Sequence, residues 1–171
     1  CFLVPILADL ARELQTSPGP LEGVRALFLY PLNALINSQR ARLLAWTHAY
    51  GERLRFCLYN GATPREVPAL EQSETPSEVR SRKLLHKNPP PILVTNATML
   101  EFMMVRSEDA PIVERSKGKL RWVVLDEAHT YVGSTAAEIA LLLRRVLHAF
   151  DVAPSDVRFV ATSATIGSGE E

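Results

Sequence analysis

The stretch VVLDEAHTY, residues Val123–Tyr131, places an apolar run directly before two adjacent acids, an alanine and a histidine. The apolar part predicts a strand that is buried on both faces, as in a parallel sheet. Burying carboxylates at the end of such a strand is costly unless they bind something. The function is therefore expected to centre on Asp126 and Glu127.

Further apolar runs of strand length alternate with helical patterns along the chain. The predicted strands cover 25–30, 54–59, 92–95, 120–125 and 157–162. One long helix is predicted from about 33 to 50 and another over 135–150, where Thr135 and Glu138 have the spacing of a helix capping box. Strands separated by helices predict βαβ units, and so an α/β fold with a parallel sheet covered by helices on both faces.

The polar segments that follow the predicted strands should all lie at one edge of this sheet, because ligands of parallel sheets bind beyond the carboxyl ends of the strands. These segments are YPLNAL (30–35), YNGATP (59–64), TNATM (95–99), DEAH (126–129) and TSAT (162–165). Unrelated polar residues would not be expected to fall at the same edge. The sequence therefore predicts one binding rim.

The acid pair suits nucleotide chemistry. An acid at the end of a buried parallel strand can hold a hydrated Mg²⁺, with substrate phosphates completing the coordination. A second acid beside it can orient or deprotonate a water for attack on a γ-phosphate. His129 can form hydrogen bonds to a neighbouring strand end, where Ser163 and Thr165 are its expected partners. The alternative, a simple loop cap formed by the two acids, is disfavoured by the apolar strand before them and the downstream SAT.

Composition favours an intracellular globular domain. The chain has 171 residues, 47% of them hydrophobic, with 19 basic and 19 acidic residues. Any contact with nucleic acid must therefore come from a local surface, because there is no basic excess. Cys1 and Cys57 have no CxxC or histidine cluster nearby, which predicts unpaired thiols and a cytoplasmic location. No apolar run reaches membrane-spanning length, so no membrane partner is expected.

Two segments differ from the regular alternation. Residues 62–91 contain six prolines and many charges, which predicts a surface excursion, assigned to 65–91, with a short helix at 77–87. Within it, RSRK (80–83) is expected to form a solvated helix face rather than a phosphate contact. The opening CFLVPILADLARELQ has the spacing of a helix interior, so the chain is expected to be part of a longer protein.

The motifs together resemble a known family. VVLDEAH followed by ATSAT resembles motifs II and III of superfamily 2 helicases, in the DEAH/DExH-box group. YPLNALINSQ (30–39) resembles motif Ia, and VTNATMLEFMM (94–104) resembles motif Ib. CFLVPIL is similar to the segment directly after the phosphate-binding GKTE in this family. Within the group, the chain most resembles RecQ-like DEAH helicases that carry a C-terminal cysteine-rich region.

The resemblance covers essentially the whole chain and implies the first RecA-like domain of an ATP-dependent helicase or translocase. This is a P-loop NTPase fold, incomplete at its N-terminus, that starts just after motif I. ATP and Mg²⁺ are the implied cofactors. The implied partners are a nucleic acid, with DNA favoured over RNA, and a second RecA-like domain of the same full-length chain.

Residue roles carry over at the matching positions. The resemblance implies that Asp126 holds the Mg²⁺ and that Glu127 is the catalytic base. The residues implied to couple ATP hydrolysis to strand movement are His129, Ser163, Ala164 and Thr165. The implied nucleic-acid contacts are Pro31, Asn33, Gln39, Gly61, Thr95 and Asn96. For Asn33 and Asn96, helix N-capping is an equally good interpretation.

The sequence also lacks one part of the expected site. No GxxxxGK[S/T] occurs, and Gly19 and Gly23 are not followed by lysine and a hydroxyl residue. Because that loop cradles the phosphates, the isolated chain is expected neither to hydrolyse ATP nor to unwind nucleic acid. An exposed sheet edge in place of the missing strand predicts self-association. Two alternatives remain open: a RecA-like nucleic-acid or protein binding module without ATPase activity, and the motor of a restriction-type translocase.

Overall fold

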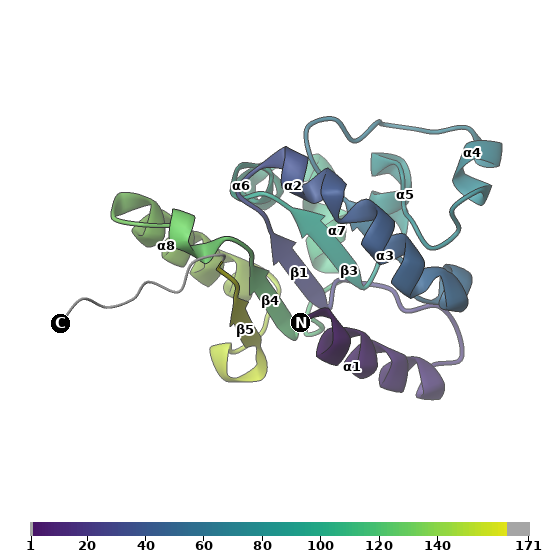
Figure 1. Cartoon of the computed structure of the whole chain (residues 1–171), viewed down its shortest axis with the longest axis horizontal. Helices are drawn as coiled ribbons and strands as arrows, with labels where there is room; N and C mark the ends of the chain where they lie inside the picture. Colours follow the sequence, from purple (N-terminus) through teal and green to yellow (C-terminus); the bar gives the residue numbers. More distant parts are fainter. Residues whose placement is uncertain (1, 164–171) are drawn as a thin grey trace.

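The architecture is a five-stranded parallel sheet between two layers of helices (Figure 1). The computed structural model describes residues 2–163. The strand order is β2-β3-β1-β4-β5, and every neighbouring pair is parallel. The strands are β1 (Ala26–Leu29), β2 (Phe56–Leu58), β3 (Ile92–Thr95), β4 (Trp122–Leu125) and β5 (Arg158–Ala161). All five predicted strands are present, and the predicted parallel α/β fold is confirmed.

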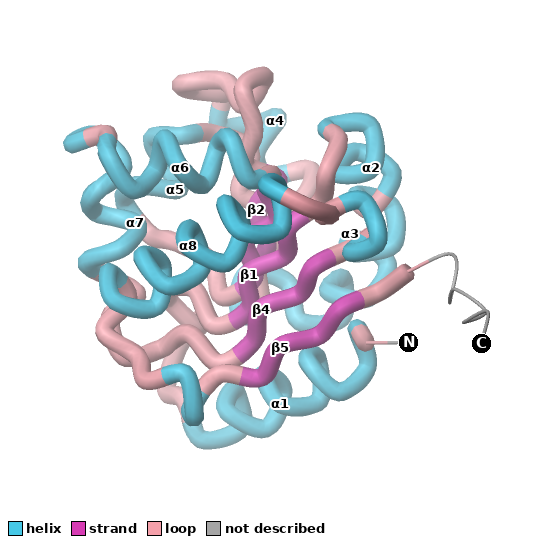
Figure 2. The backbone as a smooth tube through the Cα atoms, turned by 90° about the vertical axis from the view of Figure 1, so that its left-hand side faces the viewer, coloured by secondary structure: helices cyan, strands magenta, loops and turns pink. Residues whose placement is uncertain are grey.

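Helices cover both faces of the sheet, as the edge-on view in Figure 2 shows. The helices on one face are α1 (Leu3–Thr16), α2 (Asn33–Ser38) and α3 (Arg40–Thr47), and those on the other are α6 (Ala97–Val105), α7 (Ala110–Glu114) and α8 (Ser134–Ala149). The remaining elements are α4 (Ala69–Ser73), α5 (Arg82–Lys87) and the 3₁₀ turns η1 (His48–Arg53), η2 (Ser107–Asp109), η3 (Ala128–Thr130) and η4 (Pro154–Asp156). No helix of the described chain is long and apolar enough to span a membrane.

Burial on both faces explains why the strands are continuous apolar runs. In β1, Leu27 and Leu29 point into the cluster beneath α6, α7 and α8, whereas Ala26 and Phe28 point into the cluster beneath α1. The same alternation holds in the central neighbours β3 and β4. Each face removes apolar surface from water, and this burial is the main favourable contribution to folding.

Two helix predictions are corrected. The helix predicted over 33–50 is broken at Gln39, whose N–H bonds to the carbonyl of Ile36, three residues earlier, at 3.1 Å. α3 follows the break, and η1 continues past it through the non-helical Gly51. The capping box at Thr135 is absent, because α8 already begins at Ser134, after Gly133 with a φ of 57°. Thr135 therefore lies inside the first turn, where its side chain does not cap the helix.

The predicted surface excursion is only partly at the surface. α4 protrudes, and its Leu70 is 79% exposed. Residues 77–79 instead run beside β2, with bonds from Phe56 N to Ser77 O and from Val79 N to Phe56 O, both 2.8 Å. Val79 and Leu85 are buried in the core. The second half of the excursion therefore covers the outer edge of β2, and the helix predicted at 77–87 is reduced to α5.

The opposite edge of the sheet is open. Within residues 2–163, β5 pairs only with β4. Its Phe159 is 48% exposed, and the guanidinium of Arg158 lies 5.0 Å from the centre of the Trp122 ring. The self-association expected from an exposed edge stays a prediction.

Candidate nucleotide and nucleic-acid site

The carboxyl ends of the strands line up at one rim. In the pairing register Leu29 lies opposite both Thr95 and Leu125, and Leu125 lies opposite Ala161. The ladder continues one residue further, because Asp126 N bonds to Leu29 O at 2.9 Å and Thr162 N to Leu125 O at 2.9 Å. The polar segments that follow β1, β3, β4 and β5 therefore leave the sheet side by side, as predicted.

Asp126 is held by a residue that the sequence did not single out. The hydroxyl of Thr162 donates to Asp126 Oδ1, and the Thr162 carbonyl accepts from Ala128 N at 2.7 Å. Thr162 therefore fixes both the first acid and the turn after it. Its position as the first polar residue after β5 was the only sequence feature that could have indicated this role.

The negative charge of Asp126 affects the pKa values of two tyrosines, Tyr30 and Tyr131. Burial raises the pKa of Tyr30, and the negative charge of Asp126 raises it further. Burial and the same carboxylate also raise the pKa of Tyr131. Both tyrosines are therefore neutral at physiological pH and add no second negative charge beside Asp126.

Glu127 has an unusual backbone conformation. Its φ of 51° and ψ of 44° are left-handed, which costs a residue other than glycine about 1–3 kcal/mol. The Glu127 carbonyl accepts bonds from Thr130 N at 2.9 Å and from Thr130 Oγ1 at 2.8 Å. These bonds hold the turn, and such strained residues cluster at functional sites.

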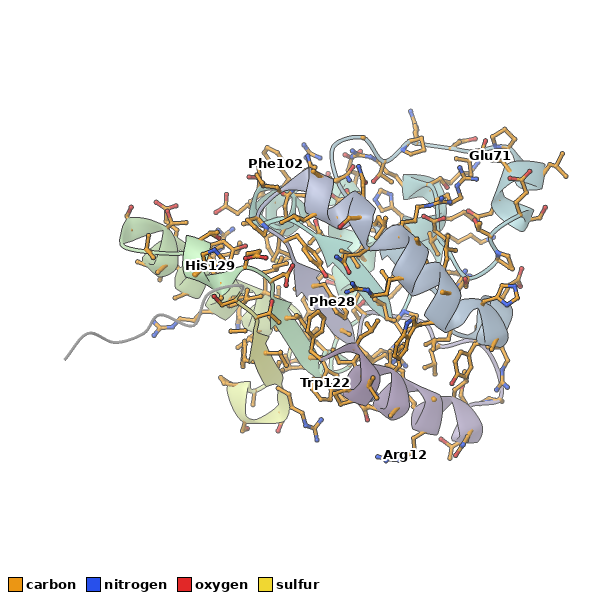
Figure 3. The ribbon with its side chains drawn as sticks, in the orientation of Figure 1. Arg12, Phe28, Glu71, Phe102, Trp122 and His129 are labelled. Carbon is orange, nitrogen blue, oxygen red and sulfur yellow. The ribbon has the colours of Figure 1, made fainter. Side chains whose placement is uncertain are left out.

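His129 joins the two strand ends. Its Nδ1 lies 3.3 Å from Glu127 Oε2 and 3.1 Å from Ser163 Oγ. The predicted contact between His129 and Ser163 is therefore present, and one ring nitrogen is within reach of both the second acid and the residue after β5. Figure 3 shows His129 beside the start of α8. Ala164 and Thr165 lie outside the described residues.

The donors suit a magnesium ion only together with a nucleotide. No cluster of three or more histidine, cysteine or acidic residues that could hold a metal occurs within residues 2–163. Asp126 uses one carboxylate oxygen for Thr162, which leaves the other for a ligand. Mg²⁺ in nucleotide enzymes is held by one or two carboxylates, with phosphates and waters as the other ligands, so a single acid at this strand end fits that pattern.

A groove of about 690 Å³ opens beside the acid pair, between α2, α6 and α8. Four of the predicted nucleic-acid residues line it: Pro31, Asn33, Gly61 and Asn96. Phe102 on α6 and Tyr131 also line it, and Figure 3 shows Phe102 at the far side of the rim from His129. The lining contains no lysine or arginine and two acids, Glu101 and Glu138.

The two asparagines of the groove have different tasks. Asn96 is the N-cap of α6, and its Oδ1 accepts from Met99 N at 2.7 Å. Its Nδ2 donates to Asn33 Oδ1 at 2.7 Å. Asn33 is not a cap, because α2 is preceded by Leu32 without a side-chain cap bond. N-capping therefore holds for Asn96 and not for Asn33.

Two predicted nucleic-acid residues are not brought into the groove. Thr95 is fully buried at 0% exposure, at the carboxyl end of β3, which lies between β2 and β1. Its hydroxyl does not line the groove, and the contact of Thr95 with nucleic acid stays a prediction. Gln39 lies at the α2–α3 junction, bonded to Arg42 and Ser38, and lines a separate small pocket.

Tyr131 was also missed by the sequence analysis. It lines the groove, and its hydroxyl is buried without a hydrogen-bond partner among the described atoms. It directly follows the DEAHT segment, so it lies between the acid pair and the groove. The only indication in the sequence was this proximity to the acids.

Similarity to known proteins also indicates a helicase domain. The family model described as DEAD/DEAH box helicase matches residues 1–171. The chain belongs to the DEAD/DEAH box helicases. The predicted resemblance to superfamily 2 helicases is thereby confirmed.

Relatives and solved structures extend the comparison. The chain is 29% identical over 173 residues to the ATP-dependent helicase YprA of Bacillus subtilis (strain 168), covering 100% of this chain and 20% of that protein. It is 26% identical over 265 residues to the Druantia protein DruE of Escherichia coli (strain UMEA 4076-1), covering 99% of this chain and 14% of that protein. The crystal structure of the DUF1998 helicase MrfA superposes with a TM-score of 0.66 at 27% identity, covering 98% of this chain and 22% of MrfA.

A further MrfA structure, bound to DNA and AMPPNP, also gives a TM-score of 0.66 at 27% identity, over 98% of this chain and 20% of that one. These likenesses confirm the predicted RecA-like fold of a first helicase domain. The chain spans about a fifth or less of the length of these proteins.

Proposed function

We propose that this chain is the first motor domain of a helicase or translocase that couples Mg-ATP hydrolysis to movement along DNA. The observation that carries the proposal is the convergence of Asp126, Glu127, His129 and Ser163 at one rim, directly beside a groove that contains Asn33 and Asn96. The similar helicase MrfA has been solved bound to DNA and AMPPNP, which supports DNA and an ATP-like nucleotide as ligands of this chain.

The acid pair divides the chemistry. A bound Mg²⁺ would polarise the phosphates of the nucleotide, and Asp126 is the residue that would hold it, through the oxygen that Thr162 leaves free. Glu127 accepts a proton from, or orients, the water that attacks the γ-phosphate. His129 keeps the Glu127 carboxylate in place through the 3.3 Å contact with Oε2. His129 also contacts Ser163, and so it connects Glu127 to the segment that follows β5.

The groove binds the sugar–phosphate backbone through neutral groups. The lining contains no lysine or arginine and includes two acids, Glu101 and Glu138, so the phosphates are contacted by amide side chains, hydroxyls and main-chain N–H groups, which commonly bind phosphate oxygens. Asn33, Asn96 and Gly61 are the contact residues that line it. Pro31 shapes the same wall. The zero net charge of the chain is consistent with this mode of binding.

The chain acts as part of a larger machine in this proposal. A second RecA-like domain of the same protein completes the ATP site, and the 171-residue chain alone does not hydrolyse ATP, because its sequence has no glycine-rich phosphate loop. A buried free thiol at Cys57 supports a reducing, cytoplasmic location. The open edge of β5 supports self-association of the isolated chain.

Nucleic-acid-stimulated ATPase activity of the full-length protein tests the proposal. Glu127→Gln is expected to lower kcat by about 10²–10⁴-fold, as for loss of a general base, with single-stranded DNA as the stimulating strand and RNA for comparison. Glu74→Gln, an exposed acid in the excursion, is the matched control and should behave as the unsubstituted protein. Turnover that survives Glu127→Gln would remove Glu127 from this role.

The ATPase assay, together with strand-binding and strand-separation assays on the same protein, distinguishes the two alternatives. A RecA-like binding module would bind the strand without any turnover in the unsubstituted protein. A restriction-type translocase would be stimulated by duplex DNA and would not separate its strands.

A further inference from the structure

The loop after β2 is bonded to itself at the edge of the groove. We define the Gly61 loop as residues 60–64. Thr63 Oγ1 accepts from Asn60 N at 3.0 Å and donates to Leu58 O at 3.0 Å, and Asn60 Oδ1 accepts from Ala62 N at 2.9 Å. Asn60 and Thr63 are buried. The loop therefore has a defined shape, with Gly61 facing the groove.

Gly61 is not needed for the fold. Its φ is not in the left-handed region, and a Cβ added there would meet no heavy atom within 4 Å. A glycine without a conformational or packing reason allows a ligand to approach the backbone closely. The backbone at Gly61 is therefore open to close approach from the groove that it lines.

A single arginine holds the carbonyls of this loop. Arg82, the first residue of α5, donates from Nε to Thr63 O at 2.9 Å. Its Nη2 lies 3.4 Å from Asn60 O and 3.5 Å from Gly61 O. Its main-chain N–H also donates to Pro64 O at 2.9 Å. The fork of a guanidinium can reach several acceptors at once, whereas the ammonium of a lysine is a single point.

The orientation of the carbonyls fixes the orientation of the amides. The described chain has no cis peptide bond, and in a planar trans peptide the N–H points opposite to the preceding carbonyl. Because Asn60 O faces Arg82, the N–H of Gly61 points away from the guanidinium. Asn60 O also accepts from Thr63 N at 3.1 Å, so this turn bond and Arg82 together keep the N–H of Gly61 turned away from the guanidinium.

Arg82 is itself held by a buried polar cluster. Its guanidinium carbon lies 5.4 Å from the centre of the Tyr59 ring. Tyr59 donates to Asp109 Oδ1 at 2.6 Å, and His86 Nε2 lies 2.8 Å from the same oxygen. Asp109 is fully buried. α5 is therefore anchored on both sides of Arg82, by the loop carbonyls and by the Tyr59–Asp109–His86 cluster.

The other cations of the RSRK segment have different partners. Arg80 pairs with Glu71, and Lys83 pairs with Glu66. The expectation that this segment is a solvated face therefore holds for the exposed Lys83 and is wrong for Arg82. Lys83 lies on the same helix and provides a matched control.

We propose that Arg82 is a positioning residue for nucleic-acid binding, which presets the Gly61 loop so that the main-chain N–H of Gly61 meets a backbone phosphate in the groove. This inference rests on the proposed function. In this proposal Arg82 does not contact the nucleic acid, because its guanidinium donates to the carbonyls of the Gly61 loop. This gives the excursion between β2 and β3 a role, because it places Arg82 of α5 against the Gly61 loop, at which the excursion begins.

The test uses the full-length protein and single-stranded oligodeoxythymidylate. The concentration of this strand that gives half-maximal ATPase stimulation is expected to rise about tenfold in Arg82→Lys, equivalent to about 1.4 kcal/mol of binding free energy. The maximal rate at saturating strand is expected to be retained. Lys83→Ala should match the unsubstituted protein, and Gly61→Ala should raise the half-maximal concentration without lowering the melting temperature.

Salt dependence separates positioning from direct phosphate contact. If Arg82 neutralised a phosphate, Arg82→Lys would restore binding and Arg82→Ala would reduce the salt slope by about one contact. The proposal requires that lysine fails to rescue and that the slope is unchanged in both variants. Rescue by lysine, a reduced slope, or normal binding by Gly61→Ala would each overturn it.

Failure of the proposed function gives a different result. In that case the unsubstituted protein itself shows no stimulation by any strand, and this inference fails with it. Stimulation of the unsubstituted protein together with normal half-maximal concentrations in Arg82→Lys overturns the positioning role alone.

Discussion

The side-chain amide of Asn96 donates to the side-chain oxygen of Asn33 at 2.7 Å, which joins the first turns of α6 and α2 across the groove. The other end of the Asn96 amide caps α6 at Met99 N. One side chain therefore stabilises a helix and sets the position of a second polar group in the proposed nucleic-acid groove.

These two tasks are separable by substitution. Asn96→Ala removes both and is expected to lower the free energy of unfolding by about 1 kcal/mol, the usual cost of a lost cap. Asn96→Ser keeps a capping oxygen and loses the bridge, so its stability in urea should be near that of the unsubstituted protein. Its affinity for single-stranded DNA should fall as in Asn33→Ala. Unchanged affinity in both Asn96→Ser and Asn33→Ala would exclude the bridge from binding.

Thr162 is expected to matter for catalysis through its hydroxyl. Thr162→Val removes the donor to Asp126 with little change in shape. Because hydrogen bonds to charged groups contribute about 1.5–3 kcal/mol, kcat/KM for Mg-ATP should fall by about tenfold or more. Thr162→Ser retains the donor and should retain activity. Steady-state ATPase kinetics check this, and equal losses in both variants would contradict it.

The left-handed Glu127 predicts a conflict between stability and activity. Glu127→Gly removes the side chain that disfavours this conformation, so the free energy of unfolding should rise by about 1 kcal/mol. Glu127→Ala keeps the backbone penalty and should not be stabilised. Both variants should lose turnover. Urea unfolding of the three proteins makes the comparison, and a glycine variant no more stable than the alanine variant would show that the turn carries no strain.

The ion pairs of Glu13 predict a dependence of stability on pH. Burial alone would raise the pKa of this carboxyl, but hydrogen bonds and charges from Arg25 and Arg121 together lower it. Glu13 lies 2.7 Å from a guanidinium nitrogen of each. A carboxyl whose pKa is lowered by folding stabilises the protein above its ordinary pKa of 4.5, and this contribution is lost as pH falls through the folded pKa.

Glu13→Gln should therefore be less stable than the unsubstituted protein at neutral pH. The difference in melting temperature should shrink as pH falls below 4.5 and vanish below the folded pKa. Glu114→Gln, which removes an exposed pair with Lys117, is the control and should change little at any pH, because exposed pairs contribute little. A difference that stays constant with pH would contradict the assignment.

The sequence predicted the sheet because β1, β3 and β4 are buried on both faces, which requires continuous apolar runs. It also predicted the rim and the contact between His129 and Ser163, because both follow directly from strand ends in a parallel sheet. The start of α8 was placed one residue late, since Gly133 begins it through its backbone conformation rather than through a side-chain cap.

Two other contacts between distant segments could not be predicted from the sequence. Thr162 reaches Asp126 across 36 positions, and Arg82 reaches Thr63 across 19. Neither separation leaves a periodic pattern, because each depends on how a loop returns to the sheet. Thr95 shows the converse, since its polar side chain at a strand end suggested a ligand contact while the register places it inside the sheet.

The two edges of the sheet differ, because residues 77–79 run beside β2 whereas β5 has a neighbour on one side only among the described residues. Among residues 2–163, association through edge pairing is therefore expected at β5. Two copies joined β5 to β5 by a twofold axis would use the open edge of each and leave none for a third, whereas growth into a fibre needs two complementary edges per molecule. The arrangement predicts that any edge-to-edge assembly of this chain stops at a pair.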